Sequence, residues 1–326
     1  MIEIRNVTKA YGDVVALDGA SMSVDEGATV GLVGTNGAGK TTLFRLLVGH
    51  ATPDDGTVRV AGREPTEGPA LRERVGFVPE DAAFDPRLTG REVLELHARL
   101  RGVPGDDRAE RVERVLATVG LADAADRRVE GYSNGMTQRL AVGTALVRRP
   151  AVLLLDEPTA ALDPRGVEAL HRVVDRIRER TSTTIVVSSH VLDEVDRLCE
   201  RVVVLDDGRV QARGSVADLA TDAADAVEVR LRPVDGDARR AAHDAVRDAI
   251  ADAPSDGAVE SRGCTLVVEC HRAVAFDVVA AARDAAALDG FEVEEPGLED
   301  AFAAAVDDAA MVDDPAVATT NGGDRA

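Results

Sequence analysis

Short apolar segments and helix-like segments follow one another over the first fifty residues. Residues 2–8 and 20–24 alternate between apolar and polar positions, which predicts two half-buried strands. Residues 28–34 form an apolar run that ends in glycine, and a helix-like segment follows at 41–50. We therefore expect a strand, a glycine-rich loop and a helix in this order, with a further strand at 56–62.

Residues 89 to about 147 have a helical pattern instead. Thr89 and Glu92 have the spacing of a capping box, which predicts that a helix begins at Thr89. Apolar positions then recur at helical spacing, and we expect one helix face to carry Val93, Leu96, His97 and Leu100. A second amphipathic helix is predicted over 108–120 and a third over 133–149.

Alternation of strands and helices returns at residue 151. The apolar run 151–158 is typical of a strand that is buried on both faces, as the central strands of parallel sheets are. The elements expected after it are a helix over 165–180, a strand over 183–190, a helix over 191–199 and a hairpin over 201–214. The Asp207-Gly208 pair is a strong signal for the turn of that hairpin.

A change of composition near residue 221 predicts a domain boundary. A polar segment leads there into a small β-α-β-α-β pattern, made of AVEVRLRPV, a helix near 237–252, TLVVEC, a helix near 272–287 and FEVEEP. We expect a first domain over residues 1–220, with a helical insertion at about 89–147, and a small α+β domain over 222–305. The acidic, aperiodic residues 306–326 predict a disordered tail.

The chain is strongly acidic. Its 326 residues suffice for about two domains, and 38 basic against 59 acidic residues give a formal net charge of −21. Such a charge repels phosphate backbones, which argues against a nucleic-acid partner. Lys9 and Lys40 are the only lysines. Abundant acid with almost no lysine is what we expect of a halophilic protein in a high-salt cytoplasm, where salt screens self-repulsion.

Membrane and secretory classes are not favoured by the pattern. The chain has no run of 18 apolar residues and no signal-peptide core near its start. Its three cysteines, Cys199, Cys264 and Cys270, lack metal-ligand spacing, which fits a reducing compartment. Cys270 precedes a histidine but ends a strand-like segment, so we expect a structural role there.

A phosphate-binding loop is predicted between the first buried strand and the helix after it. The segment 34–41, GTNGAGKT, matches G-x-x-x-x-G-K-[ST] in full and in the context that such a loop requires. Its backbone N–H groups and the helix N-terminus favour phosphate, Lys40 would reach the β- and γ-phosphates, and the Thr41 hydroxyl would bind Mg²⁺. The predicted phosphate-binding residues are Gly34, Thr35, Asn36, Gly37, Ala38, Gly39, Lys40, Thr41 and Thr42.

Two carboxylates follow the apolar strand at 151–155. Asp156 is placed to hold Mg²⁺, and Glu157 to polarise the water that attacks the γ-phosphate. Two acids at a strand end would mean little alone, but the phosphate loop makes them candidates for ATP hydrolysis.

These motifs resemble those of the ATP-binding subunits of ABC transporters, and the resemblance covers residues 1 to about 220. It implies that Tyr11 stacks on adenine, that 132–139 is the signature motif and that His190 senses the γ-phosphate. It further implies nucleotide contacts in the signature and in the D-loop, from Ser133, Asn134, Gly135 and Asp163. The implied catalytic residues are Glu157, His190 and Lys40, and the implied cofactors are ATP and Mg²⁺.

The chain departs from the family pattern at two positions. Glu80 stands where many members have glutamine, and it adds charge near the phosphates, although it can still bind Mg²⁺ beside Thr41 and Asp156. Asn134 stands where many members have glycine, which places a Cβ near a phosphate site. Ser133 can also be read simply as the N-cap of its helix, and the two interpretations coincide because a capped helix N-terminus is itself an anion site.

The resemblance also implies a fold class and partners. The expected fold is α/β, a P-loop NTPase core of the ABC ATPase type with a helical subdomain, plus the small C-terminal α+β domain. One phosphate loop and one signature imply a second ATPase subunit, most simply in a homodimer that closes on two ATP. The chain would then work on the inner face of the cell membrane with an integral-membrane permease, docked at residues 81–100.

Several functions within the family stay open. The signature, Glu80 and the extra C-terminal domain resemble export-type ATPases. Residues 77–84, 89–92 and 125–129 resemble the ATPase subunit of the Nos transporter, which helps to mature copper-containing nitrous oxide reductase. The alternatives are a drug, lipid or peptide exporter unrelated to copper and, more distantly, a soluble regulatory ABC ATPase.

Overall fold

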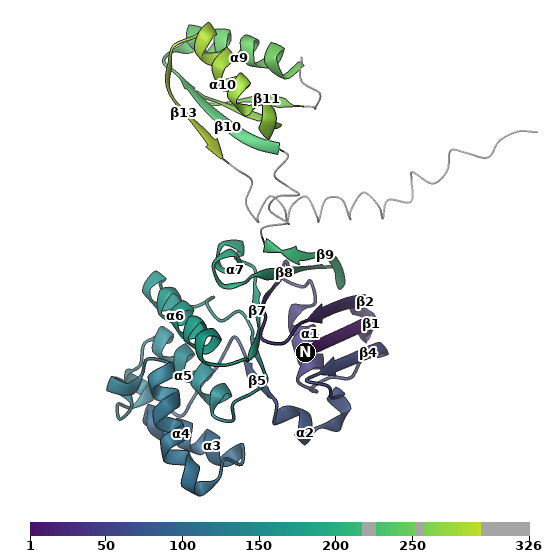
Figure 1. Cartoon of the computed structure of the whole chain (residues 1–326), viewed down its shortest axis with the longest axis vertical. Helices are drawn as coiled ribbons and strands as arrows, with labels where there is room; N and C mark the ends of the chain where they lie inside the picture. Colours follow the sequence, from purple (N-terminus) through teal and green to yellow (C-terminus); the bar gives the residue numbers. More distant parts are fainter. Residues whose placement is uncertain (217–225, 252–256, 295–326) are drawn as a thin grey trace, which may run out of the picture. The chain divides into compact units, whose positions relative to one another are not determined.

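The computed structural model describes residues 1–216, 226–251 and 257–294. The chain divides into two compact units, Met1–Ser215 and Val216–Ala326 (Figure 1). The expected disordered tail at 306–326 and the end of the expected α+β domain lie outside the described residues. Within the described ranges, no helix combines the length and the apolar character needed to cross a membrane.

The first unit contains two sheets (Figure 1). The six-stranded sheet has the order β5-β6-β7-β3-β8-β9, in which only β9 is antiparallel to its neighbour. Its strands are β3 Thr29–Val33, β5 Val75–Val78, β6 Val152–Leu155, β7 Thr184–Ser189, β8 Arg201–Asp206 and β9 Arg209–Ser215. The antiparallel sheet β2-β1-β4 consists of β1 Ile2–Tyr11, β2 Val14–Val24 and β4 Asp55–Val60.

The central strands of the larger sheet are buried along their whole length. Every residue of β3, β6 and β7 is buried. This burial explains their unbroken apolar runs, because helices and the second sheet cover both faces. Strand β5 also belongs to this sheet, although the sequence pattern did not predict a strand there. It has only four residues, too few to show a period.

Helix α1, Lys40–Leu47, is anchored in the core of the first unit. It buries Leu43, Phe44, Leu46 and Leu47 in one cluster with residues of both sheets. The other helices of this unit are α2 Pro69–Arg72, α3 Gly90–Leu100, α4 Gly105–Thr118, α5 Asn134–Leu146, α6 Pro164–Arg180 and α7 Leu192–Leu198, with short 3₁₀ helices at Pro65–Glu67, Ala122–Ala124 and Val129–Gly131. Figure 1 shows α3, α4 and α5 gathered on the side of the unit away from the sheet β2-β1-β4.

Helix α3 begins as predicted but buries a different face. Thr89 and Glu92 form the predicted capping box. The expected apolar face is wrong in part, because Leu96 is 42% exposed and Leu100 is 74% exposed. The buried positions are Gly90, Val93, Leu94 and Ala98. Since α4 and α5 pack against α3, they cover a face turned by about a quarter of the helix circumference from the expected one.

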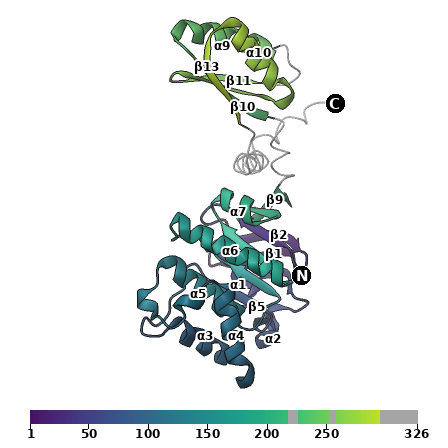
Figure 2. The ribbon, with the colours of Figure 1, turned by 60° about the vertical axis from the view of Figure 1, so that its left-hand side comes forward.

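The second unit is an antiparallel sheet with two helices on one face (Figure 2). Its elements are β10 Ala226–Pro233, α9 Gly236–Ala251, β11 Ala258–Arg262, β12 Thr265–His271, a 3₁₀ turn Arg272–Val274, α10 Ala275–Ala285 and β13 Leu288–Glu294. The sheet order is β11-β12-β10-β13, the arrangement of a split βαβ fold.

The expected β-α-β-α-β pattern omitted one strand of this unit, β11. This strand lies at the edge of the sheet, and Val259 is its only residue that is not exposed. It therefore shows no alternation of apolar and polar positions. Its pairing with β12 through a turn at Gly263 defines it, and only the tertiary structure reveals that pairing.

Candidate active site

The loop between β3 and α1 has the backbone geometry of a phosphate cradle. Gly37 and Gly39 have φ angles of 97° and 105°, in the left-handed region that favours glycine. A Cβ on Gly39 would lie 2.5 Å from the Ala16 carbonyl oxygen. No side chain caps the N-terminus of α1, so its first N–H groups are available to an anion. The other predicted phosphate-binding residues lie in this loop and the first turn: Gly34, Thr35, Asn36, Ala38, Thr41 and Thr42.

Lys40 folds back over this loop from the first position of α1. Its buried Nζ donates to the carbonyl oxygens of Gly34 at 2.8 Å and Thr35 at 3.2 Å. It also lies 3.3 Å from Oε1 of Glu157. A buried ammonium beside open N–H groups fits a bound phosphate group, because each makes favourable contacts with the anion.

Asp156 lies just beyond the carboxyl end of β6 and is buried. Its Oδ1 accepts a hydrogen bond of 2.8 Å from Ser188 Oγ. Burial raises the pKa of Asp156, and the charge of Glu157 raises it further, while hydrogen bonds from Ser188 and Thr41 and the charge of Lys40 oppose this rise. A desolvated carboxylate beside the Thr41 hydroxyl offers the oxygen ligands that Mg²⁺ prefers.

Glu80, the third predicted metal ligand, is exposed two residues beyond β5. Because β5 is parallel to β6, it lies at the same edge of the sheet as Asp156. In the part of the chain that the structure describes, no hydrogen bond or ion pair joins it to Thr41 or Asp156. The structure thus brings two of the three predicted ligands together.

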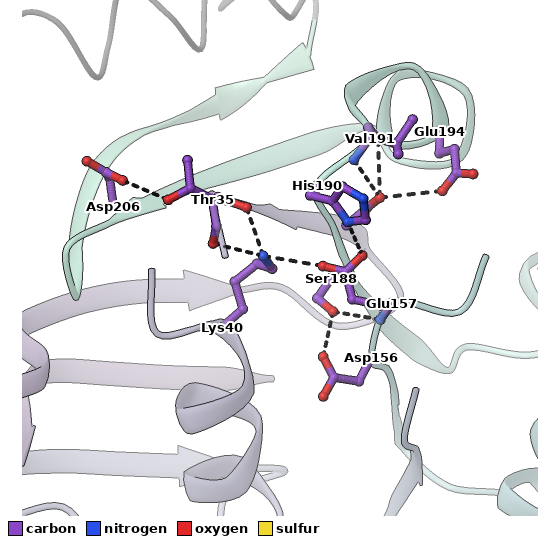
Figure 3. Close-up of polar contacts among 11 residues, drawn as sticks. Thr35, Lys40, Asp156, Glu157, Ser188, His190, Val191, Glu194 and Asp206 are labelled. Carbon is purple, nitrogen blue, oxygen red and sulfur yellow. Dashed lines mark hydrogen bonds and ion pairs between the residues drawn. The ribbon is translucent and has the colours of Figure 1, made fainter. Parts of the chain in front are cut away.

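Glu157 is held between two cationic or proton-donating groups (Figure 3). One carboxylate oxygen faces Lys40, and the other lies 2.8 Å from Nδ1 of His190. Its backbone has a φ of 42°, a conformation that a residue with a side chain rarely adopts, and strain of this kind gathers at functional sites. The three predicted catalytic residues therefore meet in one place, although they lie far apart in the sequence.

Ser188 is a site residue that the sequence reasoning missed. Besides its bond to Asp156, its Oγ accepts a hydrogen bond of 2.9 Å from the backbone N–H of Glu157. One hydroxyl therefore holds both acidic residues (Figure 3). The available signal was a pair of serines that ends an otherwise apolar strand, next to the strand that precedes Asp156.

Two further acidic residues outside the predicted set hold the loops around the site. Glu194 of α7 accepts a hydrogen bond from Thr159 and another of 3.4 Å from Ser189. These two bonds connect the turn after Glu157 to the loop that carries His190. Asp206 accepts a hydrogen bond of 3.3 Å from Thr35. These contacts join segments that are far apart in the sequence, so no local motif predicts them.

Tyr11 lies at the end of β1, with its side chain 45% exposed. The Lys9 ammonium is 5.5 Å from the ring centroid, within cation–π range. Lys9 also forms an ion pair of 2.7 Å with Asp54. An exposed ring held by neighbours on its own sheet is available for stacking against a planar base.

The signature and D-loop residues form a second group. Ser133 accepts from the Met136 N–H as N-cap of α5, and Asp163 accepts from the Gly166 N–H as N-cap of α6. The Asn134 amide donates to the Ala161 carbonyl oxygen at 3.3 Å. Gly135 is the remaining predicted residue of this group. A Cβ on Gly135 would lie 3.2 Å from the α6 backbone, so the starts of α5 and α6 lie close together there. Among the described residues, no hydrogen bond or ion pair links this group to the phosphate loop.

The fold and the site define a P-loop ATPase, and comparisons with known proteins give the family. The family model described as ABC transporter matches residues 17–160. The Nod factor export ATP-binding protein I of Cupriavidus metallidurans is 39% identical over 222 residues, which cover 67% of this chain and 72% of that protein. The daunorubicin/doxorubicin resistance ATP-binding protein DrrA of Streptomyces peucetius is 37% identical over 239 residues, covering 73% and 72%.

Solved structures agree with this family. A structure of the ATP-binding subunit of an ABC transporter matches with a TM-score of 0.61 and 28% identity, and it covers 68% of this chain and 92% of that one. A dimeric ATP-binding cassette in a post-hydrolysis state, bound to ADP and Pi, matches with a TM-score of 0.59 and 28% identity, covering 66% and 98%. The chain belongs to the family of ATP-binding subunits of ABC transporters and is an ATPase of that family.

Proposed function

We propose that this chain uses the site at Lys40, Asp156, Glu157 and His190 to hydrolyse ATP with Mg²⁺ and so powers export through a separate membrane permease. The observation that carries this proposal is the Glu157 carboxylate, which Lys40 contacts at one oxygen and His190 at the other. Family membership supplies ATP binding, and the geometry suggests how these residues divide the work.

The phosphate loop and Tyr11 bind the nucleotide. Residues 34–42 surround the phosphates with N–H groups and hydroxyls, Lys40 exchanges its contact with Glu157 for phosphate oxygens, and Tyr11 stacks on adenine. Bound Mg²⁺ would screen the phosphate charge, with Thr41 and Asp156 as its protein ligands and Glu80 near the same edge. A cation there also offsets the burial that raises the pKa of Asp156.

Glu157 is the general base in this proposal. Once Lys40 turns to the phosphates, one oxygen of Glu157 is free to take a proton from the attacking water, while His190 holds the other oxygen in position. Ser188 prevents the carboxylate from swinging away because it anchors the Glu157 backbone. His190 is exposed enough to contact a γ-phosphate directly.

A second ATPase subunit completes each site. Ser133, Asn134, Gly135 and Asp163 are gathered apart from the phosphate loop of their own chain, which is what a site shared between two subunits requires. A similar cassette of known structure is dimeric, which supports an assembly of two subunits. We propose a homodimer that closes head to tail over two ATP molecules.

The permease docks near residues 81–100. A cavity of about 490 Å³ opens beside this segment and is lined in part by His50, Arg72, Phe77, Leu100 and Arg148. The exposed Leu96 and Leu100 on α3 are apolar surface that a membrane subunit can cover. Leu100→Glu is expected to abolish co-purification with the permease and leave basal ATPase activity intact. Retained co-purification would refute this docking site, and Val234→Glu in the second unit is the control.

Export is the transport direction that the relatives favour, since they are named for Nod factor export and for daunorubicin and linearmycin resistance. The narrower resemblance to the Nos transporter is supported only by residues 77–84, 89–92 and 125–129 and stays a prediction. We place the chain on the inner face of the cell membrane, where the permease would hold it.

The decisive experiment compares the wild type with Glu157→Gln in high KCl. We expect the variant to bind ATP, to lose about 10²- to 10⁴-fold in turnover, as removal of a general base does, and to accumulate as a dimer with ATP. Glu179→Gln is the matched control, because it makes the same chemical change at an exposed position of α6 outside the site. If Glu157→Gln hydrolysed ATP as fast as the wild type, the assignment of the base would fail.

A further inference from the structure

An arginine-lined cleft opens at the amino-terminal ends of the parallel strands of the main sheet, whereas the ATP site lies at their carboxyl ends. Its volume is about 930 Å³, and seven arginines line it against two acidic residues, Glu26 and Glu73. We call it the arginine cleft and define it by Arg111, Arg149, Arg176 and Arg180, together with the apolar Val115 and Ile177. Such a concentration of positive charge needs a physical reason, because the unit that holds the cleft has more acidic than basic residues overall.

The position of the cleft separates it from the ATP site. The cleft is lined by Arg74, Ala151 and Thr183, which immediately precede β5, β6 and β7. The ATP-site residues Asp156 and His190 follow the carboxyl ends of two of these parallel strands. A strand of four to six residues is roughly 13–20 Å long, so one molecule of modest size cannot occupy both places.

Four of the seven arginines have no carboxylate partner. Within the described ranges, no ion pair is formed by Arg111, Arg149, Arg176 or Arg180, whereas Arg148 pairs with Glu73 and Arg114 with Glu110. Burial lowers the pKa of Arg111, the charges of Arg149 and Arg114 lower it further, and the charges of Asp107 and Glu110 oppose this. The Nε of Arg111 is buried and has no hydrogen-bond partner among the described residues. An anion in the cleft would relieve this repulsion.

Helix capping explains only part of this arrangement. Arg111 donates to the Val147 carbonyl oxygen at 2.8 Å, and Arg176 donates to the Thr118 carbonyl oxygen at 3.0 Å. A guanidinium has five N–H donors, so each of these bonds leaves most of the group available. Arg149 and Arg180 are exposed, and neither guanidinium donates to a helix carbonyl in the part of the chain that the structure describes.

We propose that the arginine cleft is a second anion site, which takes a small soluble molecule bearing a polyphosphate group. Guanidinium groups match phosphate oxygens in bidentate geometry, and several of them together favour a multiply charged anion. The volume lies in the usual range for small-molecule sites. The exposed Ala117, which also lines the cleft, offers apolar surface to the organic part of such a molecule.

The test uses tripolyphosphate as the probe and the full chain with Lys40→Ala, which removes the main cation of the phosphate loop. Calorimetric titration is expected to detect binding in this background. Adding Arg149→Gln or Arg180→Gln should weaken the affinity at least tenfold, whereas Arg63→Gln, which removes a charge from an exposed ion pair with Glu67, should change it less than twofold. Without Lys40→Ala, both cleft variants should keep wild-type ATPase activity, which shows that they fold.

Three outcomes would overturn the proposal. The first is no binding of tripolyphosphate to the Lys40→Ala chain. The second is an equal loss of affinity in the cleft variants and the Arg63 control, which would mean a diffuse charge effect. The third is binding of vesicles that contain phosphatidic acid without binding of tripolyphosphate, which would make the ligand a membrane surface.

Discussion

The two units of the chain differ sharply in charge. Residues 1–215 carry 29 basic and 34 acidic residues, a net charge of −5, whereas residues 216–326 carry 9 basic and 25 acidic residues, a net charge of −16. The acidic character seen in the whole sequence therefore belongs mainly to the second unit. The unit that must attract a polyanionic nucleotide is nearly balanced, which keeps the long-range repulsion of phosphate small.

Arginines that cap helices contribute part of the positive charge that nearly balances the acidic residues of the first unit. Arginines of the first unit bind the carbonyl oxygens at the ends of helices other than their own, as Arg139 does at Val119 and Gly120 and Arg178 does at Leu198. Cations there satisfy carbonyl groups that lack partners within the helix and complement its dipole. The charge of the first unit is thus partly structural.

The cores of the two units are also built differently. The first unit buries a parallel sheet on both faces, and the carboxyl ends of its strands converge on the active site. The second unit packs two helices on one face of an antiparallel sheet. The buried apolar residues of each unit form a cluster of their own, so we expect a change in the core of one unit to leave the stability of the other unaffected.

The largest expected effect follows from removing an aromatic ring from the first core. Phe44→Ala should lower the free energy of unfolding of the first unit by about 3–5 kcal/mol, because the ring is fully buried. The second unit should unfold as before. Calorimetry of the full chain measures both transitions. Leu231→Ala, in the core of the second unit, should show the reverse pattern. A common shift of both transitions would contradict two independent cores.

An intermediate effect is expected from Ser188→Ala. Loss of the hydroxyl frees Asp156 and the Glu157 backbone, so turnover should fall about 10- to 100-fold while ATP affinity changes little. Steady-state ATPase assays and ATP titration separate the two quantities. Ser188→Thr should restore part of the turnover because it keeps a hydroxyl. Ser261→Ala in the second unit is the control, and equal losses in both variants would remove Ser188 from the site.

The smallest effect concerns the buried His171 of α6. Burial lowers its pKa, the charge of Arg197 lowers it further, and Asp175 and Glu168 oppose this. Both ring nitrogens lack partners in the described structure. The unfolded chain therefore binds a proton that the folded chain does not, and stability falls as pH drops below about 6.5, by at most about 1.4 kcal/mol per pH unit.

His171→Leu should remove this part of the pH dependence. Denaturant unfolding at pH 7.5, 6.5 and 5.5 measures the free energy of unfolding. Between pH 7.5 and pH 5.5 this free energy should fall less in the variant than in the wild type. His243→Leu, on α9 of the second unit, should leave the slope of the first unit unchanged. An unaltered slope in His171→Leu would show that His171 is not responsible.

The elements that the sequence predicted best are those with a strong local signal. Thr89 and Ser133 begin helices where their capping patterns placed them, and Asp207 and Gly208 form the expected turn with positive φ angles. The predictions were weakest where the signal was not local. The buried face of α3 differs from the predicted one, because the neighbouring helices, and not the apolar period of α3, decide which of its residues are buried. Strand β11 was missed because an exposed edge strand needs no apolar alternation.

Local sequence motifs alone were enough to identify the class of the protein. A phosphate loop after a buried strand and two acids after another identify a P-loop ATPase, because the carboxyl ends of parallel strands meet at one edge of the sheet. The three-dimensional packing places Glu157 between Lys40 and His190, lets Ser188 hold both acids, and gathers arginines of α4, α6 and the segments before β5 and β6 at one cleft. The contacts of Glu157 and Ser188 join residues 31 to 117 positions apart, and they depend on strand register and helix packing, which local patterns do not encode.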